Sequence, residues 1–245
     1  MSTIDTYFDN LKALMARTQE TQKDAMETAA HAIADSLKNG GMLYTFGTGH
    51  GHLLALEIFY RAGGMARVCP ILDEKLMLHI SAAGSTLEER REEWLPILLE
   101  RYPIKKGDVL ISISNSGRNA VPVILAKAAR ERGAFVIALT SMNHSSAVTS
   151  RNSLGLRLFE TADLILDNGG VLGDASVAFA DGSMVGPTST AVGAAMLQAI
   201  VCRVKELSLD EKFEADYFKS SNVDGGDEWN DRLIARYKDI IPGLL

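Results

Sequence analysis

The sequence predicts an α/β protein with three layers, a sandwich in which a five-stranded parallel sheet carries helices on both faces. Short apolar runs rich in β-branched residues alternate along the chain with stretches of helical periodicity. The apolar runs are nearly continuous, which is typical of strands that are buried on both faces. With 245 residues, 47% of them hydrophobic and 23% charged, the chain has the length and composition of a globular protein with one substantial core.

The predicted elements follow one another in a regular order. Apolar residues at steps of three and four predict two amphipathic helices within residues 4–37, and the glycines of "NGG" at 39–41 end them. The β-rich run at 42–46 predicts the first strand, which is followed by a glycine-containing turn and a helix over 52–62. By the same criteria we expect further strands at 66–72, 108–113, 134–140 and 162–167, and further helices at 86–101, 119–132, 186–207 and 228–241.

This order of elements predicts three parts of the chain. Residues 1–38 form N-terminal helices that pack on the core, and residues 39–207 form the α/β domain. A polar, glycine-bearing loop at 220–228 separates the α/β domain from the last helix. We therefore expect residues 208–245 to form a C-terminal helical appendage.

Composition and charge argue against several classes of protein. The formal net charge is −6 and no dense stripe of lysine and arginine offsets it, so nucleic acid is not an expected partner. No run reaches the roughly 18 apolar residues of a membrane span, and the first residues lack the apolar core of a signal peptide. Cys69 and Cys202 are too few for a disulfide framework and belong to no C-x-x-C pair. We therefore expect a cytoplasmic protein without membrane contact.

The segment after the third predicted strand points most directly to a function. Ser114, Asn115, Ser116 and Gly117 lie between that strand and a helix. In an open parallel sheet, ligands bind beyond the carboxyl ends of the strands, and the free amide groups of a helix N-terminus attract anions. Because the serine hydroxyls add donors, this loop predicts a site for a phosphate group. The alternative is that Ser116 or Asn119 only caps the helix.

A second junction between strand and helix, FGTGHGH at 46–52, has the same character. The segments FGTGHGHLLALE (46–57), ISISNSGRNA (111–120) and VGPTSTAVGAAML (185–197) together resemble the sugar isomerase (SIS) domain family. The resemblance covers about residues 39–207 and is greatest to small proteins with a single SIS domain. It extends to phosphoheptose isomerase and to the isomerase domain of glucosamine-6-phosphate synthase. It implies that the chain binds a small anionic sugar on a five-stranded parallel sheet.

The resemblance also implies which residues bind the sugar and its anion. They are Gly49, His50, Gly51, Ser114, Asn115, Ser116, Gly117, Asn119 and Ser189. Two of these positions depart from the usual pattern: Asn119 stands where the family usually has threonine, and Gly51 stands where the first motif usually ends in serine. Since one expected phosphate donor is missing, a singly charged sugar sulfonate is the alternative to a phosphate.

Isomerisation of a sugar needs a group for ring opening and a base that moves a proton between C1 and C2. Glu57 is predicted to be that base, because it lies among leucines and at the position where the synthase domain places a glutamate. The alternative is that Glu57 pairs with Arg61, four residues further along the helix. His52 and His79, together with His50, are the candidates for ring opening because histidine titrates near neutral pH.

Other polar residues receive weaker interpretations. His31 lies on an amphipathic helix and is interpreted as structural or as an interface group, and His144 is a lesser candidate for a role on the substrate. An acidic series follows further along the chain, consisting of Asp163, Asp167, Asp174 and Asp181. Of these, Asp174 either reaches sugar hydroxyls or caps its own loop.

The pair of histidines in the first loop, His50 and His52, could instead begin a metal site. The zinc-dependent heptose phosphate isomerases of the family carry a histidine and a glutamate four residues apart on the helix after their first motif. In this chain the same positions hold Glu57 and Arg61. Because arginine is not a metal ligand, we expect neither a metal ion nor another cofactor.

These observations predict an aldose-ketose isomerase that acts on a sugar with a terminal anion, by ring opening and enediol proton transfer. Two alternatives stay open: a non-catalytic phosphosugar-binding sensor or regulatory protein, and an aminosugar-phosphate etherase. A sensor would keep Ser114 and Ser116 but would need no base. The N-terminal helices and the helix at 186–207 offer more apolar surface than one sheet needs, so we expect a homodimer or a dimer of dimers.

Overall fold

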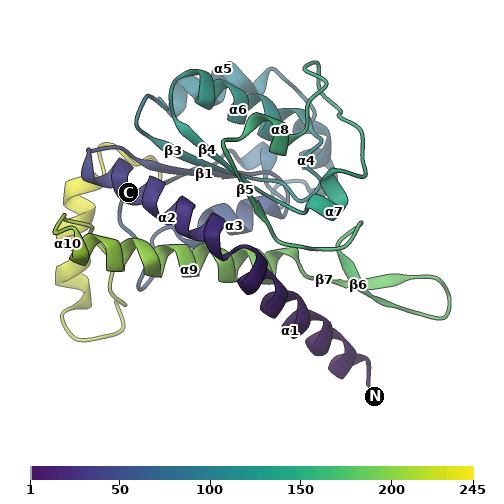
Figure 1. The fold of residues 1–245 in the computed structure, drawn as a ribbon. Coiled ribbons are helices and arrows are strands. Elements are labelled where there is room, and N and C mark those ends of the chain that lie inside the picture. Colours follow the sequence, from purple (N-terminus) through teal and green to yellow (C-terminus); the bar gives the residue numbers. More distant parts are fainter. Residues whose placement is uncertain (1) are drawn as a thin grey trace.

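A computed structural model describes residues 2–245 and is drawn in Figure 1. Its centre is a sheet of five strands in the order β2-β1-β3-β4-β5, and every pair of neighbouring strands is parallel. The strands are β1 (Leu43–Gly47), β2 (Val68–Ile71), β3 (Val109–Ile113), β4 (Phe135–Thr140) and β5 (Leu164–Asp167). Each strand agrees with a predicted apolar run to within two residues at either end. The predicted parallel sheet is therefore confirmed.

Helices precede the sheet, connect its strands and follow it. They are α1 (Thr3–Thr21), α2 (Lys23–Lys38), α3 (Gly51–Glu57), α4 (Ala82–Glu88), α5 (Trp94–Arg101), α6 (Ala120–Glu131), α7 (Met142–Ser145), α8 (Leu158–Thr161), α9 (Ser189–Asp210) and α10 (Gly226–Tyr237), with a short 3-10 helix η1 (Glu74–Leu76). The two predicted N-terminal helices are present as α1 and α2. Helix α1 begins at a capping box, in which Ser2 and Asp5 each bind the backbone N–H of the other.

Two clusters of buried side chains cover the two faces of the sheet. On one face, Leu98 of α5 and Leu125 of α6 join Leu110 of β3 in one cluster. On the other face, Ile33 of α2 and Val204 of α9 belong to a second cluster together with α3 and the other side chains of the strands. Figure 1 shows α5 and α6 on one side of the sheet and α2, α3 and α9 on the other. The predicted three-layer sandwich is therefore confirmed.

The helix expected over 86–101 is interrupted, and this prediction was wrong. It consists of α4 and α5, which are separated by residues 89–93. At the end of α4, the carbonyl oxygen of Glu89 accepts a hydrogen bond from the backbone N–H of Val121 (3.0 Å), at the start of α6. A contact with a distant segment thus takes the place of the next helical hydrogen bond, and the chain turns there.

The start of the helix expected at 186 was also misplaced. Residues 184–187 form β7 (Met184–Pro187), which pairs antiparallel with β6 (Ala175–Ala178) before α9 begins. The turn of this hairpin is closed by Asp181, whose carboxylate accepts a hydrogen bond from the backbone N–H of Ser183 (2.9 Å). Strands of only four residues carry too weak a periodicity to be recognised from sequence, and β7 also contains a glycine and a proline. Figure 1 shows the hairpin and α1 extending from the body of the molecule.

The two ends of the chain both contribute to the central core. Leu14 of α1 belongs to one buried cluster, and Leu233 and Tyr237 of α10 belong to the other. The division of the chain at residues 38 and 207 stays a prediction. Across residues 2–245, no helix is both long enough and apolar enough to cross a membrane.

Candidate functional site

A cavity of about 470 Å³ lies at the carboxyl edge of the sheet. It is lined by residues that follow β1, β3 and β5, by Leu139 of β4, and by the first residues of α9. Ligand sites of open parallel sheets are found at this edge, because the loops that leave the strands meet there. Eight of the nine predicted sugar- and anion-binding residues line this cavity: Gly49, His50, Gly51, Ser114, Asn115, Ser116, Asn119 and Ser189.

The serine loop is shaped by its own hydrogen bonds. The hydroxyl oxygen of Ser114 accepts a hydrogen bond from the backbone N–H of Gly117 (3.2 Å), and the side-chain oxygen of Asn115 accepts one from the amide of Asn168 (2.9 Å). Gly117 has a φ of +57°, and a Cβ on it would lie 2.6 Å from the hydroxyl oxygen of Ser145. Gly117, the ninth residue, therefore shapes the loop, while its neighbours Ser114 and Asn115 line the cavity.

Asn119 occupies the N-cap position of α6, but it does not act as a cap. Within the part of the chain that the structure describes, its side chain makes no capping hydrogen bond to α6. Its amide group instead donates to the carboxyl group of Glu89 (2.6 Å). The reading of Asn119 as a simple helix cap is therefore wrong, and its side chain is used inside the cavity.

The glycine loop after β1 passes very close to β3. A Cβ on Gly51 would lie 2.9 Å from the carbonyl oxygen of Ile113, a distance that real Cβ atoms essentially never show. Gly49 has a φ of +54°, and its backbone N–H donates to the carbonyl oxygen of Leu76 (3.0 Å). A serine, which the family usually has at this position, would be too close to β3 here, and this explains the glycine at position 51.

Glu89 is the functional candidate that sequence reasoning missed. Its carboxyl group lines the cavity and accepts hydrogen bonds from the Thr48 hydroxyl (2.6 Å) and from the Asn119 amide (2.6 Å). Burial raises the pKa of the Glu89 carboxyl above its ordinary value, while these two hydrogen bonds and the charges of Arg90 and Arg151 oppose the shift. A carboxyl group held in this way can exchange protons closer to neutral pH than a solvated glutamate does.

Two further polar residues in the cavity had been given weaker interpretations. His144 lines the cavity. Burial lowers the pKa of its imidazole and so favours the neutral form, although the charge of Asp174 opposes this shift. The Asp174 carboxylate accepts hydrogen bonds from the backbone N–H of Ser189 (2.9 Å) and from its hydroxyl (2.5 Å). Asp174 therefore binds the start of α9, a role that differs from the predicted capping of its own loop, and it also lines the cavity beside Ser189. Contact with sugar hydroxyls stays a prediction.

Three residues that were predicted to be catalytic are not among the described residues that line the cavity. Glu57 forms an ion pair with Arg61, the pairing that their spacing allows, and also accepts a hydrogen bond from the Gln198 amide (3.1 Å). His52 is buried and its ring contacts the carbonyl oxygen of Gly49, while His79 is exposed. Their assignment to catalysis stays a prediction.

The first loop, with His50 and His52, is the alternative metal site that the sequence offers. Among the residues described, no group of three or more His, Cys, Asp or Glu side chains is arranged to hold a metal ion. The expectation that the protein uses neither a metal nor another cofactor stays a prediction.

Solved structures with a similar fold include a phosphoheptose isomerase from Neisseria gonorrhoeae, with a TM-score of 0.56 and 17% identity over 83% of this chain and 97% of that chain. The Vibrio vulnificus NanR protein complexed with ManNAc-6P has a TM-score of 0.51 and 15% identity over 98% of this chain and 69% of that chain. Likeness at such low identity shows the fold alone.

Comparison of the sequence itself shows the family. A model of the SIS domain matches residues 6–141. The UPF0309 protein of Listeria innocua is 41% identical over 242 residues, which cover 98% of both chains. The UPF0309 protein of Geobacillus thermodenitrificans is 41% identical over 243 residues, which cover 99% of this chain and 98% of the relative. With the parallel sheet and the serine loop in place, the chain belongs to the SIS domain family and, within it, to the UPF0309 proteins.

Proposed function

We propose that this protein is an aldose-ketose isomerase whose substrate is a sugar with a terminal phosphate, bound in the cavity at the carboxyl edge. One observation carries the proposal: the serine loop and the carboxyl group of Glu89, whose pKa is raised by burial, line the same cavity. A phosphate site alone would be sufficient for binding, whereas proton transfer at carbon needs an acid/base group near it.

The phosphate is proposed to bind at the serine loop. Ser114 and Ser116 line the cavity, and α6 starts at Ala120, shortly after this loop. The first backbone N–H groups of a helix lack acceptors inside the helix and attract an anion. In α6 the N–H of Val121 already donates to the carbonyl oxygen of Glu89, so it is not among the proposed phosphate donors. A sulfonate has the same three acceptor oxygens with a single charge, and it remains the alternative anion.

The sugar is proposed to react beside Glu89. Ring opening moves the proton of the anomeric hydroxyl to the ring oxygen, and His144 and His50 line the cavity where this transfer would occur. The Glu89 carboxylate then takes the proton from C2 of the aldose while the carbonyl oxygen gains a proton, which gives an enediol. Return of the proton from Glu89 to C1 and loss of the O2 proton give the ketose, so Glu89 ends in its starting state.

Glu57, His52 and His79 are the alternative assignments for the same steps. They would become the acid/base groups only if substrate or a second protomer extended the site beyond the cavity of one chain. Glu57 is held by Arg61 and Gln198 on the side of α3 that faces α9. Substitution of Glu57 and of Glu89, one at a time, distinguishes the two assignments.

Incubation of the protein with aldose and ketose phosphates in D₂O tests the proposal. Turnover should place deuterium at C1 or C2, and NMR spectroscopy detects it. Paired sugar sulfonates in the same panel identify the anion. If a sugar phosphate raises the melting temperature but neither exchanges nor isomerises, the protein is a phosphosugar-binding sensor. If the bound ligand instead loses a C3 ether substituent, the protein is an etherase.

We also propose that the protein acts as a homodimer or a dimer of dimers. Four large apolar side chains are more than 40% exposed where α1 meets the β6–β7 hairpin: Ile4, Phe8, Phe179 and Val185. An apolar surface of this kind is typical of an interface with another chain. The proposed location is the cytoplasm, since Cys69 and Cys202 are both free thiols, as is usual in a reducing compartment.

A further inference from the structure

One stretch of the chain, residues 168–190, forms one wall of the cavity at the carboxyl edge, and we call it the wall segment. It runs from the end of β5 through the β6–β7 hairpin to the first residues of α9. Its two strands pair with each other and lie outside the five-stranded sheet. The residues of the wall segment that line the cavity are Asn168, Gly173, Asp174, Pro187, Ser189 and Thr190. Since the central sheet does not hold this wall, contacts with other elements are needed to fix it.

Helix α1 lies against the wall segment along one of its sides. Figure 1 shows this helix extending beside the hairpin, and α1 contacts both β6 and α9. Residues three or four positions apart lie on the same face of a helix. Four residues at this spacing contact the wall segment: Tyr7, Asn10, Leu14 and Arg17. Three of these side chains carry hydrogen-bond donors, so this face of α1 can bind backbone as well as pack against it.

Tyr7, Asn10 and Arg17 join the two elements by hydrogen bonds. The Tyr7 hydroxyl donates to the carbonyl oxygen of Pro187 (3.0 Å), at the end of β7. The Asn10 amide donates to a carbonyl oxygen of β6 (2.8 Å), and the Arg17 guanidinium donates to the carbonyl oxygen of Gly169 (3.0 Å). Each acceptor belongs to the backbone, so these bonds fix the path of the chain along the wall segment.

Two glycines allow the wall segment to pass close to α1. Gly169 has a φ of +66°, and a Cβ on it would lie 3.0 Å from a methyl carbon of Leu14. Gly186 has a φ of +76°, and a Cβ on it would lie 2.7 Å from the ring of Tyr7. Glycine adopts positive φ without strain and leaves room for the helix. The close contact therefore depends on residues of both elements.

The points at which α1 holds the wall segment lie next to residues of the cavity. Gly169 follows Asn168, a buried residue whose amide donates to the side-chain oxygen of Asn115 in the serine loop (2.9 Å). Pro187 lines the cavity itself and precedes Ser189 by two residues. A shift of the backbone at either point would therefore move side chains that line the cavity.

We propose that α1 sets the affinity of the carboxyl-edge cavity for its ligand, with Tyr7, Asn10 and Arg17 as positioning residues that hold the wall segment in place. The inference rests on the proposed function of that cavity. A wall that is already ordered loses less conformational entropy when a ligand binds, which favours tighter binding. Release of the wall segment from α1 should therefore weaken binding of a sugar phosphate.

The double variant Tyr7→Phe with Arg17→Ala removes two of the hydrogen bonds and keeps the ring of Tyr7. The Kd and the KM for sugar phosphate should each rise by at least about fivefold, since one hydrogen bond corresponds to a factor of about two to ten. The value of kcat should stay within about threefold, because Glu89 is held by residues outside the wall segment. Lys12→Ala is the matched control, because Lys12 is exposed on α1 and its ion pair is with Asp9 of the same helix.

A conservative substitution separates positioning from a general loss of stability. Arg17→Lys keeps a charged donor on the same face of α1, whereas Arg17→Ala removes it. Sugar phosphate should therefore bind more tightly to Arg17→Lys than to Arg17→Ala. Because Arg17 is exposed, both single variants should fold.

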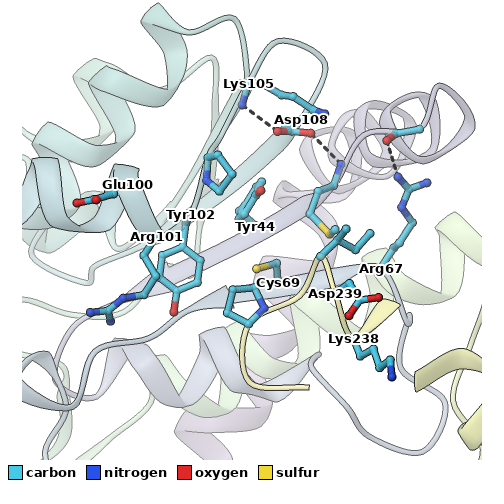
Figure 2. A pocket seen from close by; sticks show the side chains of 15 residues that line it. Tyr44, Arg67, Cys69, Glu100, Arg101, Tyr102, Lys105, Asp108, Lys238 and Asp239 are labelled. Carbon is cyan, nitrogen blue, oxygen red and sulfur yellow. Dashed lines mark hydrogen bonds between the residues drawn. The ribbon is translucent and has the colours of Figure 1, made fainter. Parts of the chain in front are cut away.

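Hydrogen exchange in the absence of ligand tests the contact itself. Backbone amides of residues 168–190 should exchange faster in the double variant than in the wild type. The opposite, amino edge of the sheet provides an internal reference, because none of the described residues of α1 lines the cavity of about 480 Å³ there. At that cavity the backbone N–H groups of Met42 and Lys105 donate to the Asp108 carboxylate (2.9 Å each), as Figure 2 shows. Their exchange should not change.

The outcomes distinguish this inference from the proposed function. The inference is overturned if the double variant binds sugar phosphate as tightly as Lys12→Ala does, if Arg17→Lys binds no more tightly than Arg17→Ala, or if exchange in residues 168–190 stays at the wild-type rate. Faster exchange there, in a protein whose wild type binds no sugar phosphate, would refute the proposed function and still support the positioning role of α1.

Discussion

Glu89→Gln is the substitution that tests the proposed chemistry most directly. In the structure, the Glu89 carboxyl group accepts a hydrogen bond of 2.6 Å from the Thr48 hydroxyl and one of 2.6 Å from the Asn119 amide. Glutamine has nearly the same shape. Its oxygen can accept from Asn119, and its nitrogen can donate to Thr48, whose hydroxyl also acts as an acceptor. The variant should therefore fold and bind sugar phosphate, but it has no group that can take a proton from carbon.

The expected loss of activity follows from that missing base. General acid–base catalysis is typically worth about 10²–10⁴-fold, so kcat should fall by about this factor while KM changes little. Deuterium incorporation at C2 should fall in parallel. A Glu89→Gln protein that exchanges and isomerises at the wild-type rate would refute the assignment of Glu89 as the base.

The same variant carries a prediction for stability. Burial raises the pKa of Glu89 in the folded protein above its ordinary value. The native state therefore holds a proton that the unfolded state has released, and wild-type stability falls as pH rises through the interval between the two pKa values. At pH values above that interval, each unit by which the pKa is raised lowers the free energy of unfolding by about 1.36 kcal/mol. Glu89→Gln removes this loss.

Urea denaturation measures the difference in free energy of unfolding at two pH values. Glu89→Gln should be more stable than the wild type at about pH 8, and the difference should disappear by about pH 4, below the ordinary pKa of glutamate. A variant that is less stable than the wild type at the higher pH would show that the two hydrogen bonds outweigh burial, which would refute the raised pKa.

Four further substitutions test other parts of the site and the assembly. Glu57→Gln should keep kcat within about tenfold of the wild type, whereas a loss of about 10²–10⁴-fold would return the role of base to Glu57. Joint replacement of Ser114 and Ser116 by alanine should raise the Kd for sugar phosphate by at least about tenfold in calorimetry, and an unchanged Kd would remove the loop from the site. Gly51→Ser should lower the free energy of unfolding by about 1–3 kcal/mol through overpacking, and equal stability would show that a serine fits. Phe8→Asp should shift light-scattering mass towards the 26.5 kDa monomer, and a wild type that is already monomeric would contradict the dimer.

Much of the fold could be predicted from the sequence because it depends on local patterns. The five strands were recognisable because a strand covered on both faces is almost entirely apolar, and β1, β2 and β3 are indeed buried along their whole length. The N-terminal helices were recognisable from spacing at three and four residues. The hairpin was missed because its strands are only four residues long. The break between α4 and α5 was missed because a hydrogen bond to a distant segment determines it.

The candidate site divides in the same way. The sequence by itself determined where the serine loop around Ser114 lies, since a polar loop between a buried strand and a helix lies at the ligand-binding edge of a parallel sheet. Only the tertiary structure decided which carboxyl group joins that loop. Glu89 stands in a charged run that is typical of a solvated helix face, and its hydrogen-bond partners Thr48 and Asn119 are 41 and 30 residues away. Burial of its carboxyl group, which raises its pKa, arises from packing between segments that no local pattern brings together.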